Sequence, residues 1–152
     1  MTVKRFSTIL ISALAFLAGA ISAAAQNADD IIGEYFSKQG ADEYKARISR
    51  NADGSYKGQI TWVSNSIDPA TGKTALDVKN PDKSLRSTPC DRIVLFNGVK
   101  FNSAKKIWDG AKIYDPQRGI KANLSIKKNA DGNLSIRGTL MGIGETVIWK
   151  RL

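Results

Sequence analysis

Apolar and polar residues alternate along most of the chain after residue 32, with a period of two instead of the 3.6 of a helix. This alternation predicts short β-strands that each bury one face. Besides two hairpins described below, strands are expected at 33–37, 92–96, 105–114 and 145–152. They are separated by breaks at Asn97-Gly98, 115–119 and 141–144. A single helical turn is expected in "ADDIIG", capped by Asp29.

The tetrapeptide Asn-Ala-Asp-Gly occurs twice, at 51–54 and 129–132. It is not a calcium loop of the EF-hand type, because placing each glycine at position six puts Ile60 or Gly138 at position twelve, where a bidentate Glu is needed. It suits a hairpin loop of three residues, whose last residue is a glycine in the left-handed conformation. We therefore interpret both copies as turns between antiparallel strands.

The apolar pattern selects this loop length, since a two-residue loop would mix the two faces of the strands. The predicted cross-strand pairs of the two hairpins are Tyr44–Trp62, Ala46–Ile60 and Ile48–Gly58, then Ala122–Leu140, Leu124–Gly138 and Ile126–Ile136. The outward positions carry Lys45, Arg47, Lys57, Lys121, Lys127 and Arg137. Each hairpin is thus expected to have an apolar inner face and a basic outer face.

These elements predict an all-β protein, an antiparallel up-and-down β-barrel of about eight strands, because closure removes exposed strand edges. A long loop, 64–91, joins the third and fourth strands and has no sustained periodicity. Loops of this length often cover or form binding sites. A binding segment and a structural flap over one barrel end are both open interpretations.

The first residues predict export. Lys4 and Arg5 precede an uncharged run, and Ala23-Ala24-Ala25 has the small residues that a signal peptidase cleaves. We expect a signal peptide at 1–25 and a single β-barrel domain at 26–152, located in the periplasm of a Gram-negative bacterium or secreted. The apolar run is short for a membrane span.

Charge and composition narrow the function. Removing Lys4 and Arg5 from 23 basic residues leaves 21 against 14 acidic residues, a net charge of +7. The positive net charge favours an anionic envelope component or an anionic ligand as the partner, or it serves solubility alone. Export argues against nucleic acid as the partner. The chain has no histidine, which excludes Ser/His/Asp and Cys/His catalysis. Cys90 is the only cysteine and is expected to be a small buried thiol entering a strand.

Three blocks resemble one family: "DVKNPDKSLR" at 77–86, "IWDGAKIYDPQRG" at 107–119 and "RGTLMGIGETVIWKR" at 137–151. Their order is similar to that of the bacterial exported family known as domain of unknown function 2147, DUF2147. That resemblance implies a lipocalin-like (calycin) barrel and export. It does not imply any particular activity or catalytic residue. In calycins a Gly-x-Trp near the start packs against an arginine of the last strand, positions that Gly33-Glu34-Tyr35 and Arg151 would take.

Two functions follow from these patterns. The first is binding of a small apolar or amphipathic anionic ligand, a fatty acid or lipid fragment, inside the barrel with its acid group at a basic rim. Small inward residues leave room for it: Ala46, Gly58, Ala122, Gly138 and Gly142. The second is a solid-cored envelope protein that contacts an anionic surface or partner protein through its basic face. Eight-stranded barrels can have either interior.

Candidate ligand-binding residues are those that lie in the family-like blocks or beside the long loop: Trp62, Asp77, Asn80, Trp108, Tyr114 and Arg137. Core packing is the commoner fate of strand tryptophans, and an outward strand position that of Arg137. An enzyme is not expected, because Asp77, Asp109 and Asp115 all lie in turn contexts where Asp usually caps the backbone. No cofactor or metal is expected.

Overall fold

A computed structural model describes residues 25–152, so the expected signal peptide lies almost entirely outside the described residues. Nine strands form one antiparallel sheet: β1 (Gly33–Gln39), β2 (Asp42–Arg50), β3 (Tyr56–Val63), β4 (Val94–Asn102), β5 (Ile107–Asp109), β6 (Lys112–Asp115), β7 (Ile120–Lys128), β8 (Leu134–Leu140) and β9 (Ile143–Arg151). Three short 3-10 helices accompany them: η1 (Ala28–Ile31), η2 (Lys83–Leu85) and η3 (Cys90–Arg92).

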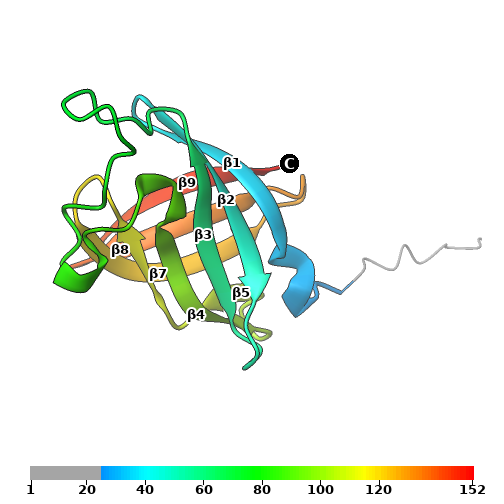
Figure 1. Ribbon diagram of the computed structural model, residues 1–152. Coiled ribbons are helices and arrows are strands. Elements are labelled where there is room, and N and C mark those ends of the chain that lie inside the picture. The colour runs from blue at the N-terminus through cyan, green and yellow to red at the C-terminus, as the bar shows by residue number, and fades with distance from the viewer. Residues whose placement is uncertain (1–24) are drawn as a thin grey trace, which may run out of the picture.

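The sheet closes into a barrel. Consecutive strands pair from β1 to β4 and from β7 to β9. Strands β5 and β6 both pair with β4 on one side and with β7 on the other, and β9 returns to pair with β1. Because β5 and β6 together occupy a single strand position between β4 and β7, the nine strands make the eight-stranded up-and-down barrel that the sequence predicts (Figure 1). The single strand expected at 105–114 is broken at Gly110, whose φ is 85°.

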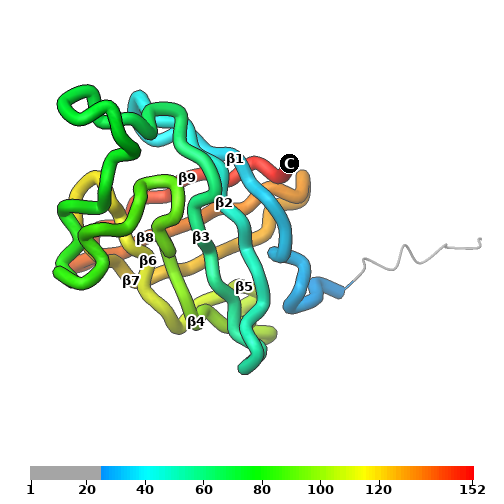
Figure 2. The backbone as a smooth tube through the Cα atoms, viewed as in Figure 1, coloured from blue at the N-terminus to red at the C-terminus, as the bar shows by residue number. Residues whose placement is uncertain are grey.

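The barrel has two different ends. One end, which we call the closed end, carries the β2–β3, β4–β5 and β7–β8 turns together with η1. The other, the open end, carries the β1–β2, β6–β7 and β8–β9 turns and the 64–91 segment. The 64–91 segment and η1 lie on opposite sides of the barrel (Figure 2). Both Asn-Ala-Asp-Gly turns therefore lie at the closed end.

The two turns have the predicted geometry. Asn51 N donates to Ser55 O at 2.8 Å, and Asn129 N donates to Asn133 O at 2.8 Å. Gly54 and Gly132 have φ of 83° and 85°, the left-handed conformation that glycine adopts without steric cost. The carboxylate of Asp53 accepts a hydrogen bond from Ser55 N at 2.9 Å. That of Asp131 accepts one from Asn133 N at 3.0 Å.

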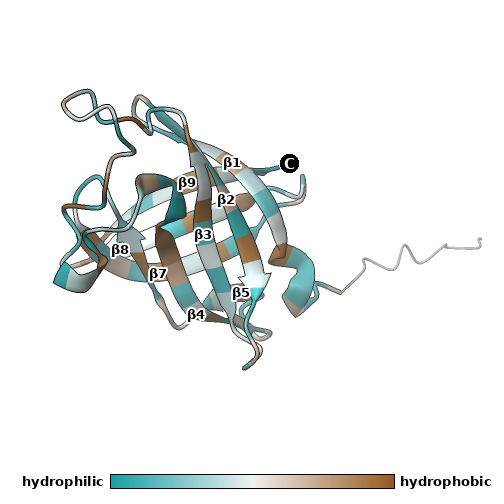
Figure 3. Cartoon of the chain, viewed as in Figure 1, coloured by the Kyte–Doolittle hydropathy of each residue, from teal (hydrophilic) through white to brown (hydrophobic). Residues whose placement is uncertain are grey.

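Most of the predicted register is confirmed. Ile48 pairs with Gly58, Ala46 with Ile60, Ile126 with Ile136, and Leu124 with Gly138. All the apolar members of these pairs are buried, and hydrophobic and hydrophilic residues alternate along the strands in Figure 3. The barrel interior is therefore the apolar core that the alternation predicts.

One register prediction and one predicted break are wrong, and a ladder irregularity lies at each place. The β2–β3 ladder shifts between Lys45 and Ala46, so Tyr44 pairs with Val63 and Trp62 pairs with Lys45. An extra residue in one strand reverses the faces beyond it, and Trp62 therefore points outward. Asn97-Gly98, expected as a break, lies inside β4, where the β3–β4 ladder also shifts.

The N-terminal 3-10 helix closes one end. Its cap is Asn27, not Asp29: the Asn27 side chain accepts from Asp29 N at 3.1 Å. Asp29 instead accepts from Tyr56 Oη at 2.6 Å. Trp108 Nε1 donates to the carbonyl of Ala28 at 2.8 Å.

Arg151 ties the last strand to the first, as the calycin resemblance implies. Its guanidinium lies 5.5 Å from the centre of the Tyr35 ring. It donates to Tyr35 Oη at 2.8 Å and to the carbonyls of Asp30 and Ile32 at 3.1 and 2.7 Å. A Cβ at Gly33 would lie 3.1 Å from this group, so the missing side chain makes room for the arginine.

Candidate functional site

The interior is filled in one half and hollow in the other. Near the closed end, fully buried side chains occupy the barrel, among them Tyr35, Tyr56, Val99, Trp108 and Ile126. Toward the open end lies a cavity of about 590 Å³, within the range of small-molecule sites. From the sequence, either a ligand cavity or an interior filled by side chains was possible. The barrel combines the two: the half at the closed end is filled, and the half at the open end holds the cavity.

The walls of the cavity are apolar. They are formed by inward residues of the strands and by η3 and its flank: Ile60, Val63, Ile93, Leu95, Ile113, Ala122, Ile136, Gly138, Val147 and Trp149. Trp149 lies among three aromatic rings, at 5.9 Å from Tyr35, 6.1 Å from Tyr44 and 6.2 Å from Phe96. Its Nε1 donates to Tyr44 Oη at 2.9 Å. The indole thus separates the filled half from the cavity.

Only two of the five small inward residues leave space in the cavity. Ala122 and Gly138 line it. The space beside Gly58 is taken by the ring of Phe96, Ala46 is buried, and Gly142 lies in the β8–β9 turn with open space around it. Parity alone does not tell which of these positions a neighbouring ring fills.

The mouth is formed by the open-end turns and the long segment. Exposed residues that line the cavity include Val78, Gln117, Leu140 and Ile143, so the cavity opens to solvent there. Leu76 and Val78 of the long segment are 46% and 65% exposed. The 64–91 segment therefore contributes both to the wall and to the rim of the cavity.

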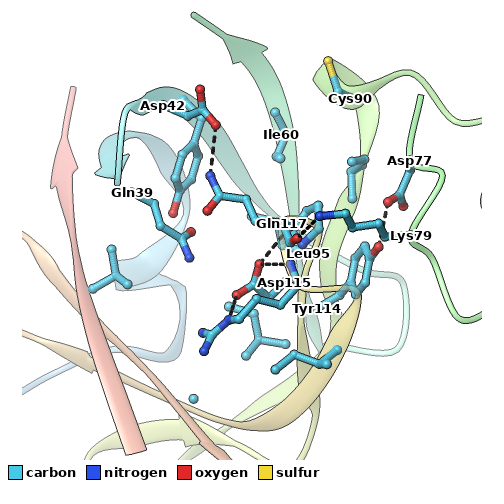
Figure 4. A pocket seen from close by; sticks show the side chains of 18 of the residues that line it. Gln39, Asp42, Ile60, Asp77, Lys79, Cys90, Leu95, Tyr114, Asp115 and Gln117 are labelled. Atoms are coloured by element: carbon cyan, nitrogen blue, oxygen red, sulfur yellow. Dashed lines mark hydrogen bonds and ion pairs between the residues drawn. The ribbon is translucent and has the colours of Figure 1, made fainter. Parts of the chain in front are cut away.

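Polar side chains tie the turns of the mouth to one another (Figure 4). Gln117 Nε2 donates to Asp42 Oδ2 at 3.0 Å across the mouth. Lys79 Nζ donates to the carbonyl of Gln117 at 2.7 Å. Arg118 bridges Asp115 and Glu145 at 2.6 Å each, which raises the pKa of its guanidinium. We call Asp42, Lys79, Gln117, Arg118 and Glu145 the mouth clasp.

Asp77 is buried in the cavity wall. Tyr114 Oη donates to its Oδ1 at 2.6 Å, and Asn80 Nδ2 donates to its Oδ2 at 2.7 Å. Burial raises the pKa of Tyr114, and the hydrogen bond to Asp77 raises that pKa further. The phenol is therefore protonated and acts as the donor.

The cavity lining is more acidic than the sequence suggested. It includes four carboxylates, Asp42, Asp77, Asp115 and Glu145, against the two cations Lys79 and Arg118. The basic rim that we expected at the mouth is therefore wrong. Alternation identifies outward positions, and those carry the lysines, whereas the mouth is built from turns.

The six candidate residues separate into three groups. Asp77 and Tyr114 line the cavity, and Asn80 contacts Asp77. Trp108 is fully buried in the filled half. Trp62 and Arg137 lie on the outer wall, where Arg137 donates to Thr146 Oγ1 at 3.3 Å. Trp62, Trp108 and Arg137 therefore do not line the cavity.

Sequence reasoning missed several lining residues. Tyr44, Leu95, Ile113, Val147 and Trp149 are inward strand residues that look like any core position in a period-two pattern. Cys90 also lines the cavity. It lies in η3, ahead of β4 and not within a strand, and burial raises the pKa of its thiol.

The fold and site define a class of protein: a closed antiparallel up-and-down barrel with a one-ended apolar cavity, which is the lipocalin-like architecture. The structure is similar to "Protein HP1028 from the human pathogen Helicobacter pylori belongs to the lipocalin family", with a TM-score of 0.64 and 21% identity over 80% of this chain and 82% of that chain. At this identity the likeness concerns the fold.

A family match also shows which family this chain belongs to. The model of the family described as "Uncharacterized protein conserved in bacteria (DUF2147)" matches residues 33–151, so the chain belongs to this family. This match confirms the resemblance carried by the three sequence blocks. A search of curated proteins finds no significant match.

Residues 25–152 were also compared with the requirements of a membrane-spanning helix and of a metal site. None of their helices combines the length and apolarity needed to cross a bilayer. They also contain no group of three His, Cys, Asp or Glu side chains placed to hold a metal ion.

Proposed function

We propose that the protein binds a small apolar or amphipathic molecule inside the barrel. The observation that carries this proposal is the cavity of about 590 Å³ with apolar walls and a mouth of exposed loops. Burial of an apolar ligand there contributes roughly 25 cal/mol per Å² of apolar surface removed from water. The resemblance to a lipocalin-like fold is consistent with this use of a barrel interior.

A cavity-filling variant tests the proposal. Ala122 lines the cavity, whereas the next residue of β7, Asn123, is exposed. Ala122→Phe should abolish binding of a neutral fluorescent probe such as N-phenyl-1-naphthylamine, and Asn123→Phe should leave probe binding unchanged. Failure of the unaltered protein to bind the probe, and absence of any ligand by native mass spectrometry of protein from its host envelope, would reject the proposal.

We also propose that binding takes place after export. The support is the run that follows Lys4 and Arg5 and ends in three alanines. Mass spectrometry of protein from the native host should give a mature chain that starts at Gln26, in the periplasmic fraction or the medium. A chain that retains Met1 in the cytosol would contradict this.

Binding without catalysis is part of the same proposal. The carboxylates that could act as an acid and base pair have other partners: Asp115 accepts from Gln117 N at 2.9 Å and pairs with Arg118, and Asp77 accepts from Tyr114 and Asn80. A panel of glycosidase and esterase substrates should show no turnover above that of buffer. Turnover that Asp77→Asn abolishes would refute this.

A second candidate function is contact with an anionic envelope surface, and one observation on the outer wall favours it. Lys150, Phe36, Lys45 and Trp62 lie directly opposite one another on four neighbouring strands. The Lys45 ammonium is 5.7 Å from the centre of the Trp62 ring. Alternating cations and aromatic rings suit the boundary of an anionic lipid layer.

This candidate predicts salt-sensitive binding to vesicles. Lys45→Glu with Lys150→Glu should weaken co-sedimentation with phosphatidylglycerol vesicles several-fold, whereas Lys127→Glu with Lys105→Glu, away from the row, should have a smaller effect. Equal losses for both pairs would show a general charge effect. Neither pair of lysines lines the cavity, so probe binding should be unchanged in both variants.

A further inference from the structure

The charges of the cavity do not balance. Arg118 contacts both Asp115 and Glu145, so one cation is shared by two carboxylates. Within residues 25–152, the side-chain donors to the Asp42 carboxylate are the amides of Asn65 and Gln117, at 2.8 and 3.0 Å. The remaining cation of the lining, Lys79, is hydrogen-bonded to a backbone carbonyl. The lining therefore carries a formal excess of negative charge.

Asp77 is the most buried of these carboxylates, at 4% exposure. Both of its hydrogen-bond donors, Tyr114 and Asn80, are neutral. Within residues 25–152 no Lys or Arg lies within the 4.0 Å of an ion pair with it. Arg86 donates to the carbonyl of Asn80 at 2.7 Å but does not line the cavity.

A carboxylate in this position has a physical consequence for ligands. Its attraction to a cation is stronger than at an exposed site, because the surrounding dielectric is lower than that of water. Its repulsion of an anion is stronger for the same reason. Its oxygens also accept hydrogen bonds, which an ammonium or hydroxyl group can donate and an ionised carboxylate cannot.

We infer that the cavity selects amphipathic ligands with a cationic amine head group over those with a carboxylate, with Asp77 and Asp42 as the groups that recognise the amine. This inference rests on the proposed function, since it names the ligand class of the same cavity. The alkyl part of the ligand packs against the apolar walls near Trp149, and the amine lies toward the carboxylates of the wall and mouth.

The inference differs from what the composition suggests. The excess of basic residues favours an anionic ligand when only the net charge is considered. The lysines on the outer positions of β2, β7 and β9 are directed away from the cavity, however, and exposed charges act weakly beyond a Debye length of about 10 Å. The groups that meet a bound ligand are those of the lining.

Three decyl compounds with the same chain provide the test. Decylamine, decanol and decanoate are compared by displacement of N-phenyl-1-naphthylamine at pH 7, below their critical micelle concentrations. Decylammonium should bind about tenfold more tightly than decanoate, a difference of about 1.4 kcal/mol, with decanol between them. Equal affinities, or tighter binding of decanoate, would overturn the inference.

Charge-removing variants locate the effect. Asp77→Asn should reduce the preference for decylammonium over decanoate to about threefold or less and leave decanol affinity nearly unchanged. Asp42→Asn tests the same idea at the mouth and remains informative if the buried substitution impairs folding. Asp109→Asn, on β5 and outside the cavity, removes the same charge and should keep the full preference.

The outcomes separate this inference from the proposed function. If the probe and decanol bind but the amine is not preferred, the inference is wrong and the binding function stands. If the preference exists but neither Asp77→Asn nor Asp42→Asn changes it, the two carboxylates are not its source and the inference is also wrong. If neither the probe nor any decyl compound binds, both proposals fail.

Discussion

At the scale of single residues, Gly58 and Gly138 show how the barrel acquires a filled half and a hollow half. Both are inward positions of strands, each opposite a buried aliphatic residue. The ring of Phe96 occupies the place where a Cβ of Gly58 would lie. A Cβ at Gly138 would meet Ala122 at 3.3 Å and Ile113 at 3.5 Å and then face the cavity.

These two glycines give the first prediction. Gly58→Ala should destabilise the protein by about 1–3 kcal/mol, because the added methyl group forces Phe96 out of its position. Gly138→Ala should cost less than about 1 kcal/mol, since the cavity can accept the methyl group. Urea denaturation followed by circular dichroism measures both, and equal losses would contradict the account of the interior.

At the scale of elements, η1 is a plug tied to the barrel by side chains from several strands. Tyr56 and Arg50 contact Asp29, and Lys128 contacts Asp30 at 3.2 Å. Burial and the hydrogen bond to Asp29 raise the pKa of Tyr56 to about 12. The hydrogen bond from Tyr56 to Asp29 is lost when the phenol gives up its proton.

The second prediction follows from that pKa. A group whose pKa is higher in the folded state stabilises the protein below its unfolded pKa, near 10, and loses this contribution as pH rises toward the folded value. The stability advantage of the unaltered protein over Tyr56→Phe should therefore be constant from pH 7 to about 9.5 and decline between pH 10 and 12. Urea titrations of both proteins at each pH measure this stability difference. A difference that grows above pH 10 would contradict the prediction.

The mouth clasp connects several elements at the open end of the barrel. It joins the β6–β7 turn to the β1–β2 turn, to the long segment and to β9. All of these contacts lie at the rim of the cavity, so they hold the mouth while leaving the closed end untouched.

The third prediction concerns this clasp. Gln117→Ala removes the bond to Asp42 across the mouth and should speed release of the bound probe about two- to fivefold, with a stability loss of no more than about 1 kcal/mol. Stopped-flow displacement measures the release rate. Gln59→Ala is the matched control, because Gln59 makes a comparable 2.9 Å bond to Arg92 O outside the cavity. An equal effect of both variants would refute a specific role for the clasp.

The element scale also shows what a sequence can predict. The two Asn-Ala-Asp-Gly hairpins were predictable because a glycine in a turn and alternating side chains define one register on each side of it. Trp62 was not, because the bulge beside Lys45 depends on how β2 and β3 twist against each other, and one extra residue exchanges the faces. The split at Gly110 has a local origin, because this glycine follows Asp109 and has a positive φ of 85° between β5 and β6.

The candidate site was predictable only in part. Asp77 and Tyr114 were named because they lie in family-like blocks near the long loop, and both line the cavity. The basic rim was wrong because a segment without periodicity gives no indication of which side chains turn inward. Trp149 is one of the strand tryptophans for which core packing is expected, but nothing in the alternation distinguishes a residue that lines a cavity from one packed on all sides.

At the scale of the whole molecule, positive charge and binding capacity lie in different places. The exposed cations Lys45, Lys127 and Lys150 are on the outer wall, whereas the cavity has apolar walls and an acidic lining. The wall and the cavity can therefore respond to different partners in the same protein.

The fourth prediction tests that separation. Affinity for the neutral probe should change less than about twofold between about 0.05 M and about 0.5 M NaCl, because its binding buries apolar surface. Association with anionic vesicles should weaken strongly over the same range. Measuring both in one salt series, with zwitterionic vesicles as control, is decisive: a parallel decline would place both events on the basic wall.

The position of both Asn-Ala-Asp-Gly turns at the closed end has a practical consequence. A biotinylated cysteine introduced at exposed Ala130, in a background where Cys90 is replaced by serine, would immobilise the barrel on a biosensor chip with its entrance facing the flowing solution. The same attachment at exposed Met141 would obstruct the entrance. The two orientations would give different response curves for one and the same analyte.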